Sequence, residues 1–257
     1  MDCRLLHTSR RGAALAFVAV LASACGTSSG TNPSTTPAPA PASELAPTHG
    51  TYAPTIDPTN FVSTVDNPYW PLRPGTTYVY RGVRGSTPQT DTEVVTDQTK
   101  QILGITAIVV RDTVSEHGAP IERTFDWYAQ DKEGNVWYLG EDSSNFEHGR
   151  WVKDDGSWQA GVGNGQPGII MLAHPHRGDA YRQEYSPGHA VDQAQVLGGG
   201  GAVRTPYRRF KRTLLTLEYS TIDKQYELKW HGRGAGVIKE QAVTKSKELS
   251  RLVTINH

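Results

Sequence analysis

Cysteine is nearly absent from this chain of 257 residues, which contains only Cys3 and Cys25. Both lie close to the N-terminus, so the rest of the chain offers no disulfide, no thiol nucleophile and no thiolate metal ligand. An excess of charge of one sign is missing as well, since Lys+Arg 26 balance Asp+Glu 26. Nucleic-acid binding requires a basic surface, so we expect no nucleic-acid partner.

Long hydrophobic runs and helical periodicity are also missing. No apolar run reaches the roughly 18 residues that suggest a membrane-spanning helix, which argues against a polytopic membrane protein. No stretch repeats apolar residues with a helical period of about 3.6. Hydrophobic residues make up only 37% of the chain, against Gly 26 and Pro 16. This balance predicts that part of the chain has no core of its own.

The chain does have an export signal at its N-terminus. Arginines precede the apolar run GAALAFVAVL at 12–21, and small residues follow it up to Cys25. The segment Leu21–Cys25 (LASAC) resembles the lipobox of bacterial lipoproteins, in which the cysteine is diacylated, although Ala22 stands where that family usually has Leu. We therefore predict a lipoprotein signal peptide over 1–25 and lipidation of Cys25. The alternative is ordinary secretion, which would leave Cys25 as a free thiol.

Residues 26–56 are predicted to form a disordered tether rich in Pro, Ser and Thr. The segment reads GTSSGTNPSTTPAPAPASELAPTHGTYAPTI and contains little that a core would bury. Two lipid chains anchor a protein stably. The predicted location is therefore the outer face of a bacterial membrane, with the tether as a spacer.

Residues 57–257 are predicted to form an all-β exported domain. Runs such as Thr76–Arg81, Thr106–Val114 and Ile121–Tyr128 alternate along the chain and are separated by Gly, Pro, Asn and Asp. This pattern is typical of antiparallel strands, of which we expect roughly ten to twelve. The segment Ala129–Gly134 (AQDKEG) fits the turn of a hairpin.

Two parts of this domain look alike. Both 71–142 and 174–244 begin with a Gly three residues before a Tyr and end on an aromatic strand, a Gly-containing turn and a second strand. We interpret them as two antiparallel meanders, possible copies of one unit, that together form one barrel or sandwich. Chance similarity between meanders is the alternative.

Two segments of the domain resemble a family of uncharacterised exported bacterial β-rich proteins. They are Asn67–Tyr78 (NPYWPLRPGTTY) and Phe125–Tyr138 (FDWYAQDKEGNVWY). The resemblance covers most of 57–257. It implies export and a β fold, and it implies no catalytic residues.

Histidines provide the best spacing for a metal site. His174 and His176 would point to the same side of an extended segment, so both imidazoles could reach one ion. However, Pro175 between them favours a loop, and the sequence indicates no third ligand. We expect no metal and no cofactor, and keep His174 and His176 as weak metal candidates.

Aromatic residues are the remaining candidates for a binding site. Trp151 and Trp158 flank a polar turn and precede a Gly-rich loop, an unusual place for core residues. Together with Trp127 and Tyr128 they are predicted to contact an apolar or sugar ligand. The alternative is that these aromatic side chains fill the core.

The sequence therefore predicts a lipid-anchored cell-envelope protein whose β domain is a ligand-binding or structural module. Catalysis is not expected. The alternative is an envelope hydrolase with a His/carboxylate site, possibly with a metal. Other envelope proteins are possible partners through exposed strand edges.

Overall fold

The computed structural model describes residues 42–222, 224–244 and 247–257. The predicted signal peptide 1–25, with Cys25, and the tether up to residue 41 lie outside the described residues. Within them, no helix is long and apolar enough to cross a membrane. The helical elements are a short α-helix and one 3₁₀ turn, α1 (Ala42–Leu45) and η1 (Pro58–Asn60).

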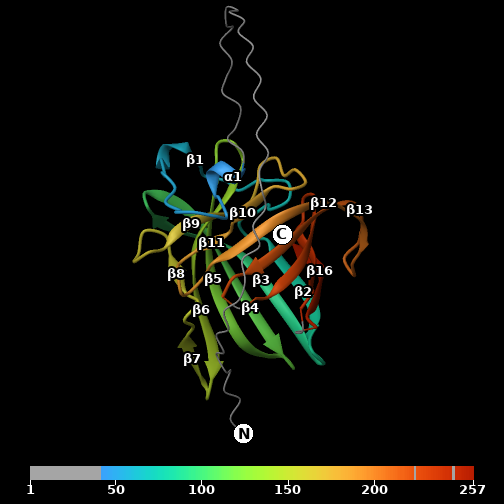
Figure 1. Ribbon diagram of the computed structural model, residues 1–257. Coiled ribbons are helices and arrows are strands. Elements are labelled where there is room, and N and C mark those ends of the chain that lie inside the picture. The colour runs from blue at the N-terminus through green and yellow to red at the C-terminus, as the bar shows by residue number, and fades with distance from the viewer. Residues whose placement is uncertain (1–41, 223, 245–246) are drawn as a thin grey trace, which may run out of the picture. The chain divides into compact units, whose positions relative to one another are not determined.

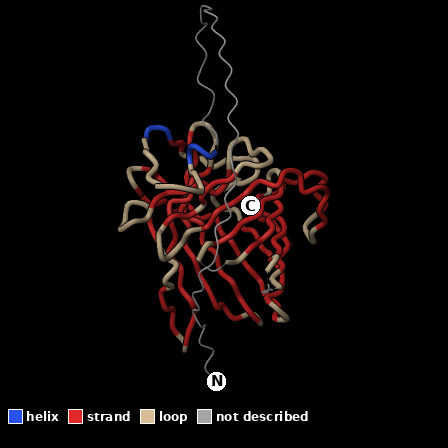
Figure 2. The backbone as a smooth tube through the Cα atoms, viewed as in Figure 1, coloured by secondary structure: helices blue, strands red, loops and turns tan. Residues whose placement is uncertain are grey.

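Strands make up most of the described chain, and the loops between them gather largely at the end where the helical segments lie (Figure 2). The strands are β1 (Phe61–Val62), β2 (Thr77–Arg84), β3 (Thr87–Ile102), β4 (Ile105–Glu116), β5 (Ala119–Asp131), β6 (Val136–Glu147), β7 (Arg150–Lys153), β8 (Trp158–Gln159), β9 (Gln166–Met171), β10 (Ala180–Arg182), β11 (Glu184–Tyr185), β12 (Asp192–Arg204), β13 (Arg209–Ser220), β14 (Tyr226–Gly232), β15 (Gly236–Ala242) and β16 (Leu249–Asn256).

All these strands belong to one antiparallel sheet, whose main path has the order β10-β12-β13-β14-β15-β16-β2-β3-β4-β5-β6-β9-β11 (Figure 1). Off this path, β1 pairs with β5, and β7 and β8 pair with β6. The prediction of an all-β fold built from antiparallel meanders is therefore confirmed. One meander runs from β2 to β6 and the other from β12 to β16, and the pairing of β16 with β2 joins them. The sheet rolls up into a nearly closed barrel and does not form a sandwich. The duplication of 71–142 and 174–244 stays a prediction.

The barrel closes because its two edge strands are parts of one chain segment. β10 pairs with β12, and β11 pairs with β9, while only Gln183 separates β10 from β11. At this seam Gly168 of β9 faces the backbone of Gln183. A Cβ added to Gly168 would lie 2.1 Å from the Gln183 carbonyl oxygen, so only glycine allows this approach.

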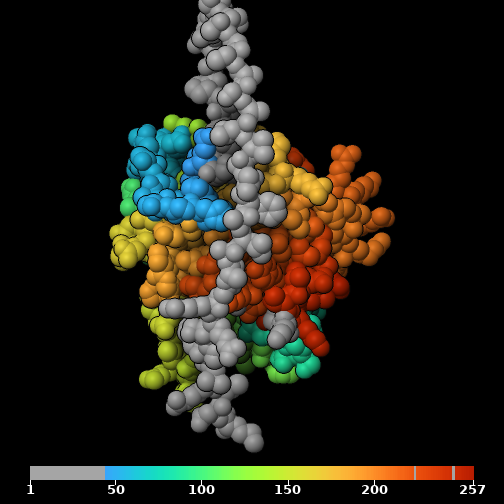
Figure 3. Space-filling view, in the orientation of Figure 1, coloured from blue at the N-terminus to red at the C-terminus, as the bar shows by residue number. Residues whose placement is uncertain are grey.

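The folded part begins earlier than residue 57, the boundary that the sequence predicted. Ala46 and Tyr52 are buried, and the Tyr52 hydroxyl donates to the carbonyl of Pro167 in β9. The Arg182 side chain in β10 donates to the carbonyl of Pro47 at 2.7 Å. In Figure 3 these first described residues (blue) lie against the surface at one end of the sheet. Their Pro- and Thr-rich composition conceals this packing, because their few apolar side chains bury against strands distant in sequence.

A second segment, residues 65–72, lies across the same end of the barrel, and we call it the plug. Val65 and Leu72 pair with each other and are buried. Asn67 is buried too, and its side-chain amide donates to the carbonyls of Gly134 and Leu172 at 2.9 and 3.0 Å. These bonds connect the plug to the turn between β5 and β6 and to the residue that follows β9, and they fix it over the barrel interior.

Candidate ligand-binding cavity

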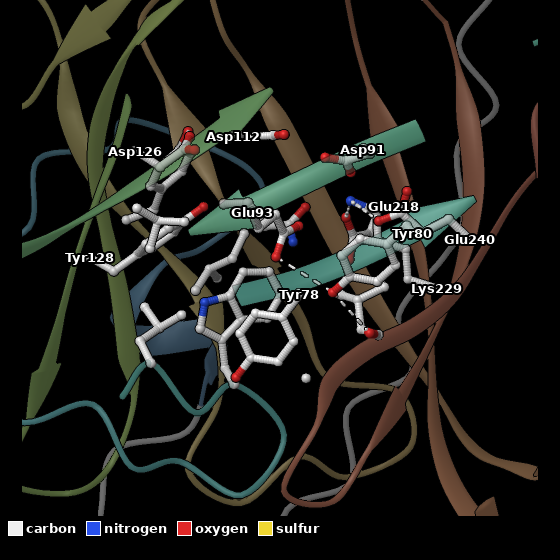
Figure 4. Close-up of a pocket in the computed structure, with 18 of the residues that line it drawn as sticks. Tyr78, Tyr80, Asp91, Glu93, Asp112, Asp126, Tyr128, Glu218, Lys229 and Glu240 are labelled. Atoms are coloured by element: carbon white, nitrogen blue, oxygen red, sulfur yellow. Dashed lines mark hydrogen bonds and ion pairs between the residues drawn. The ribbon is translucent and has the colours of Figure 1, made fainter. Parts of the chain in front are cut away.

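The rolled sheet encloses a cavity of about 290 Å³ below the plug. Strand register explains its lining on β2 and β3, where Tyr78 pairs with Glu93 and Tyr80 with Asp91. Because side chains alternate between the two faces of a strand, all four side chains point inward. Figure 4 shows them converging on one space from neighbouring strands.

Aromatic rings form the end of the cavity beneath the plug. The Trp70 ring lies 5.8 Å from that of Tyr128 on β5 and 6.1 Å from that of His231 on β14. The Tyr128 and Tyr138 rings stack at 4.7 Å, and the Tyr78 hydroxyl donates to the plug carbonyl of Pro71 at 2.9 Å. Trp70 thus spans two strands far apart in the sheet order and closes this end of the barrel.

Carboxyl groups dominate the rest of the lining. Eight acidic residues face the cavity, against a single basic residue, Lys229, among the described lining residues. The acidic residues are Asp91, Glu93, Asp112, Asp126, Glu184, Asp192, Glu218 and Glu240. Carboxylates so close together repel one another when ionised, and burial disfavours their charged forms further. The cavity therefore favours protons or a positively charged group.

Lys229 already has its own partners. Its Nζ lies 3.0 Å from Glu218 and 3.6 Å from Glu240. Burial would raise the pKa of Glu218, but Lys229, His231 and a hydrogen bond from Gln183 together outweigh this effect and hold that pKa below its usual value. Beside this pair, burial lowers the pKa of His231 to about 4, and its Nε2 lies 3.1 Å from the hydroxyl of Thr216. His231 is therefore neutral, and Lys229 is the positive charge of this wall.

On the neighbouring wall Asp91, Glu93 and Asp112 form a cluster that we call the carboxylate triad. Their carboxylate oxygens lie within 4.8 Å of one another. Burial, followed by repulsion from neighbouring acids, raises the pKa of Asp91 and of Glu93 well above the usual values, and burial raises that of Asp112. The side chains of Asp91 and Asp112 also line a second cavity of about 190 Å³ that extends toward the other end of the barrel. The triad thus stands between the two cavities.

A further acidic pair lies on β5 and β6. Burial raises the pKa of Asp126 to about 7, although the Tyr138 hydroxyl donates to its Oδ1 and opposes this rise. Burial and the neighbouring Asp126 raise the pKa of Glu141 to about 9. Near neutral pH one of these two carboxyl groups carries a proton.

Of the four aromatic residues predicted to bind a ligand, Tyr128 lines the cavity and the other three do not. Trp127 is buried and lies under Lys100, whose Nζ is 3.2 Å from its ring centre. Trp158 is buried against the edge of Tyr138, so the expectation that it lies outside the core is wrong. Trp151 packs on Phe146 in the β6–β7 hairpin. Local polarity around Trp158 misled the prediction because β8 pairs back onto β6.

The two histidines proposed as weak metal ligands lie away from the cavity. His174 and His176 are exposed in the loop between β9 and β10. Asp179 accepts from the His176 backbone N–H at 2.7 Å and caps this loop. Among the described residues, the group with the spacing of a metal site is the carboxylate triad.

Sequence reasoning missed the acidic lining. Its only signal is the spacing of charges two residues apart, as in Asp91-Thr92-Glu93 and in Glu227-Leu228-Lys229. Such spacing places charges on one face of a strand. This spacing does not show whether that face points into a barrel or toward solvent. By itself it predicts a solvent-exposed face.

Comparisons with known proteins give similarity in fold only. No family model matches the chain, and no curated protein matches it. One similar structure is a candidate exported protein with a YmcC-like fold from Bacteroides fragilis, with 15% identity, a TM-score of 0.43 and coverage of 74% of this chain and 99% of that chain. Another is a proposed lipoprotein from Parabacteroides distasonis, with 10% identity, a TM-score of 0.39 and coverage of 73% and 98%.

Proposed function

We propose that this protein is an exported, lipid-anchored binding module of the bacterial cell envelope. Its ligand is a small molecule rich in hydrogen-bond donors, with positive charge favoured, and it occupies the barrel interior. The anchor is the lipid on Cys25, supported by the arginines, the apolar run and the small residues of 1–25. The tether from residue 26 then holds the β domain away from the membrane.

The observation that carries the proposal is the acid-rich, aromatic-walled cavity of about 290 Å³. Small-molecule sites are concave, contain aromatic side chains and place a few polar groups to orient the ligand. Here the polar groups are mainly hydrogen-bond acceptors, so a matching ligand supplies hydroxyl or ammonium donors. A purely apolar ligand does not match this lining, because it would leave the carboxyl groups without partners. A sugar matches through its hydroxyls and through stacking on Tyr128.

An unsatisfied polar atom beside the cavity supports the same interpretation. Trp70 lines the cavity, and its Nε1 is buried and has no hydrogen-bond partner among the described residues. This donor stands beside a lining made mainly of acceptors. Buried donors without partners are uncommon in folded proteins, so its presence here favours a polar occupant.

The test is native mass spectrometry on the full-length lipoprotein purified from its original host, compared with its denatured mass. We expect an added organic mass that is lost on denaturation. The informative variant is Tyr128→Ala, which removes a ring from the cavity wall. Trp151→Ala is the matched control, because it removes an aromatic ring that does not line the cavity. A bare chain in every preparation, or equal ligand loss in both variants, would contradict the proposal.

A second candidate function is carboxylate-based hydrolysis in the same cavity. The observation that favours it is Asp126, whose pKa of about 7 suits a general acid at neutral pH. Glycoside hydrolysis uses such a protonated carboxyl beside a second, ionised one. Turnover of aryl glycosides that disappears in Asp126→Asn would establish this function. Unchanged substrate over long incubation would refute it.

A further inference from the structure

The carboxylate triad is built by two neighbouring strands. Asp91 and Glu93 are two residues apart on β3 and share its inward face. β4 runs antiparallel beside β3, with Val94 paired to Arg111, and this register brings Asp112 next to Glu93. The carboxylate oxygens of the three residues lie within 4.8 Å of one another. Rigid strands therefore hold the three groups close to one point in the barrel interior (Figure 4).

No cation of the described chain forms an ion pair with this triad, although the charge of Lys229 acts on Glu93 and Asp112 from a distance. Lys229 is bound by Glu218 and Glu240 at 3.0 and 3.6 Å, and none of the ion pairs of the described residues includes a triad member. The Tyr80 hydroxyl lies 3.4 Å from Glu93, and Asp112 accepts a hydrogen bond from the backbone N–H of Thr113.

Two oxygens of the triad have no donor from outside the cluster. The Oδ1 atoms of Asp91 and Asp112 are buried and accept from no other described side chain. Among side chains, the two carboxyl groups hydrogen-bond only to each other, which requires a shared proton. Buried charged groups are normally paired or coordinate a metal ion. When both groups are ionised, a cation between the two strands can therefore take the place of that proton.

We propose that Asp91, Glu93 and Asp112 bind one calcium ion inside the barrel. Ca²⁺ takes oxygen ligands at about 2.3–2.6 Å, so two oxygens on one ion lie up to about 5 Å apart. The carboxylate oxygens of the triad lie within 4.8 Å of one another, which that limit allows. Mg²⁺ demands near-ideal octahedral geometry and gives up its water reluctantly, so three carboxylates held on fixed strands suit it less well. Zn²⁺ and copper favour imidazole or thiolate, which the triad lacks.

The surroundings fit the remaining coordination positions of calcium. Ca²⁺ takes about six to eight oxygens, and three carboxylates supply three to six of them. Asp91 and Asp112 line both cavities, of about 290 and 190 Å³, so water reaches the ion from two sides. This inference rests on the proposed function in one respect, because the ion occupies the wall of the proposed ligand cavity.

The experiment uses the full-length lipoprotein in detergent, stripped of metal with a chelator. Isothermal titration with CaCl₂ at a mildly alkaline pH measures affinity and stoichiometry. Tb³⁺, which replaces Ca²⁺, is then added with excitation of tyrosine, because Tyr80 lies against the triad. We expect one Ca²⁺ per chain, and Tb³⁺ emission that added Ca²⁺ abolishes.

Asp112→Asn tests the assignment, because it keeps the shape of the side chain and removes its charge. We expect affinity to fall at least about tenfold, since even groups that only orient metal ligands are worth about 10–100-fold. Asp142→Asn is the matched control, because it makes the same change at an exposed carboxylate that pairs with Lys153 and lines neither cavity. There we expect little change. If the melting curve of Asp112→Asn shows that this variant is not folded, Asp91→Asn takes its place in the experiment.

The outcomes separate the two proposals. No calcium binding by the folded protein, equal weakening in Asp112→Asn and Asp142→Asn, or equal affinity for Mg²⁺ would each overturn the calcium site. An organic ligand without calcium affinity would leave the proposed function intact. Calcium binding by a protein that never carries an organic mass would support the triad and count against the small-molecule ligand.

Discussion

Asp126 lies on the inner face of β5, and its protonation state links stability to pH. Burial raises its pKa to about 7, the Tyr138 hydrogen bond opposes this rise, Asp112 and Glu122 add to it, and Lys229 opposes it. Glu141 on β6 is the carboxyl group that titrates with it. In the unfolded chain an aspartate titrates near pH 3.9.

The sign of the pH effect follows from these two states. Below about pH 4 both states hold the proton, so the residue has no net effect. Between about pH 4 and 7 the unfolded chain releases the proton while the folded protein keeps it, so stability falls as pH rises. Above about pH 7 the penalty is complete. A shift of about three pKa units corresponds to about 4 kcal/mol, and this is an upper limit because water partly screens a half-buried side chain.

Asp126→Asn removes this penalty and keeps an oxygen that accepts from Tyr138. We expect almost no gain near pH 4 and a gain of up to about 4 kcal/mol near pH 8, measured by urea unfolding with tryptophan fluorescence in chelator. Asp142→Asn is the control, since that exposed carboxylate only pairs with Lys153 at 3.2 Å. A gain independent of pH would show that folding does not raise the pKa of Asp126, and a loss of stability near pH 8 would show that its carboxylate is ionised and satisfied in the folded protein.

Three more predictions follow from the same structure. Lys229→Met leaves its partner carboxylates uncompensated and should destabilise the fold by about 3–5 kcal/mol near pH 8 in urea unfolding, and by less in acid. Gly168→Ala places a Cβ 2.1 Å from the Gln183 carbonyl oxygen, so we expect a loss of about 1–3 kcal/mol and faster amide exchange along β9 and β11. Cys25→Ser should move the protein from the membrane fraction to the soluble fraction, and retention in the membrane would refute the lipid anchor.

Strand alternation in the sequence was sufficient for the fold class. Segments such as Thr76–Arg81 and Ile121–Tyr128 alternate strongly, and both lie in observed strands. The hairpin predicted at Ala129–Gly134 lies at the junction of β5 and β6. These features depend on residues close in sequence, which is why they were predictable. The start of the folded part was not, because Tyr52 finds its partner 115 residues away, at Pro167.

The candidate site depends on contacts between residues that are far apart in the sequence. Trp70 meets Tyr128 and His231 only when the plug lies over the rolled sheet. The aromatic candidates were chosen from local polarity, and this indicator failed for Trp158 because β8 folds back onto β6. The acids were overlooked because a charged residue in a strand usually faces water.

The sequence by itself determined the β architecture, since alternation and turn residues are local properties of the chain. The export and lipidation signal over 1–25 is read from the same kind of local pattern and stays a prediction. Only the tertiary structure decided which face of each strand is the inside. A sheet that closes through the segment Ala180–Tyr185 has an interior, and the period-two pattern is identical whichever face turns inward. Closure of the barrel thereby converts acids that look like surface residues into the lining of a cavity.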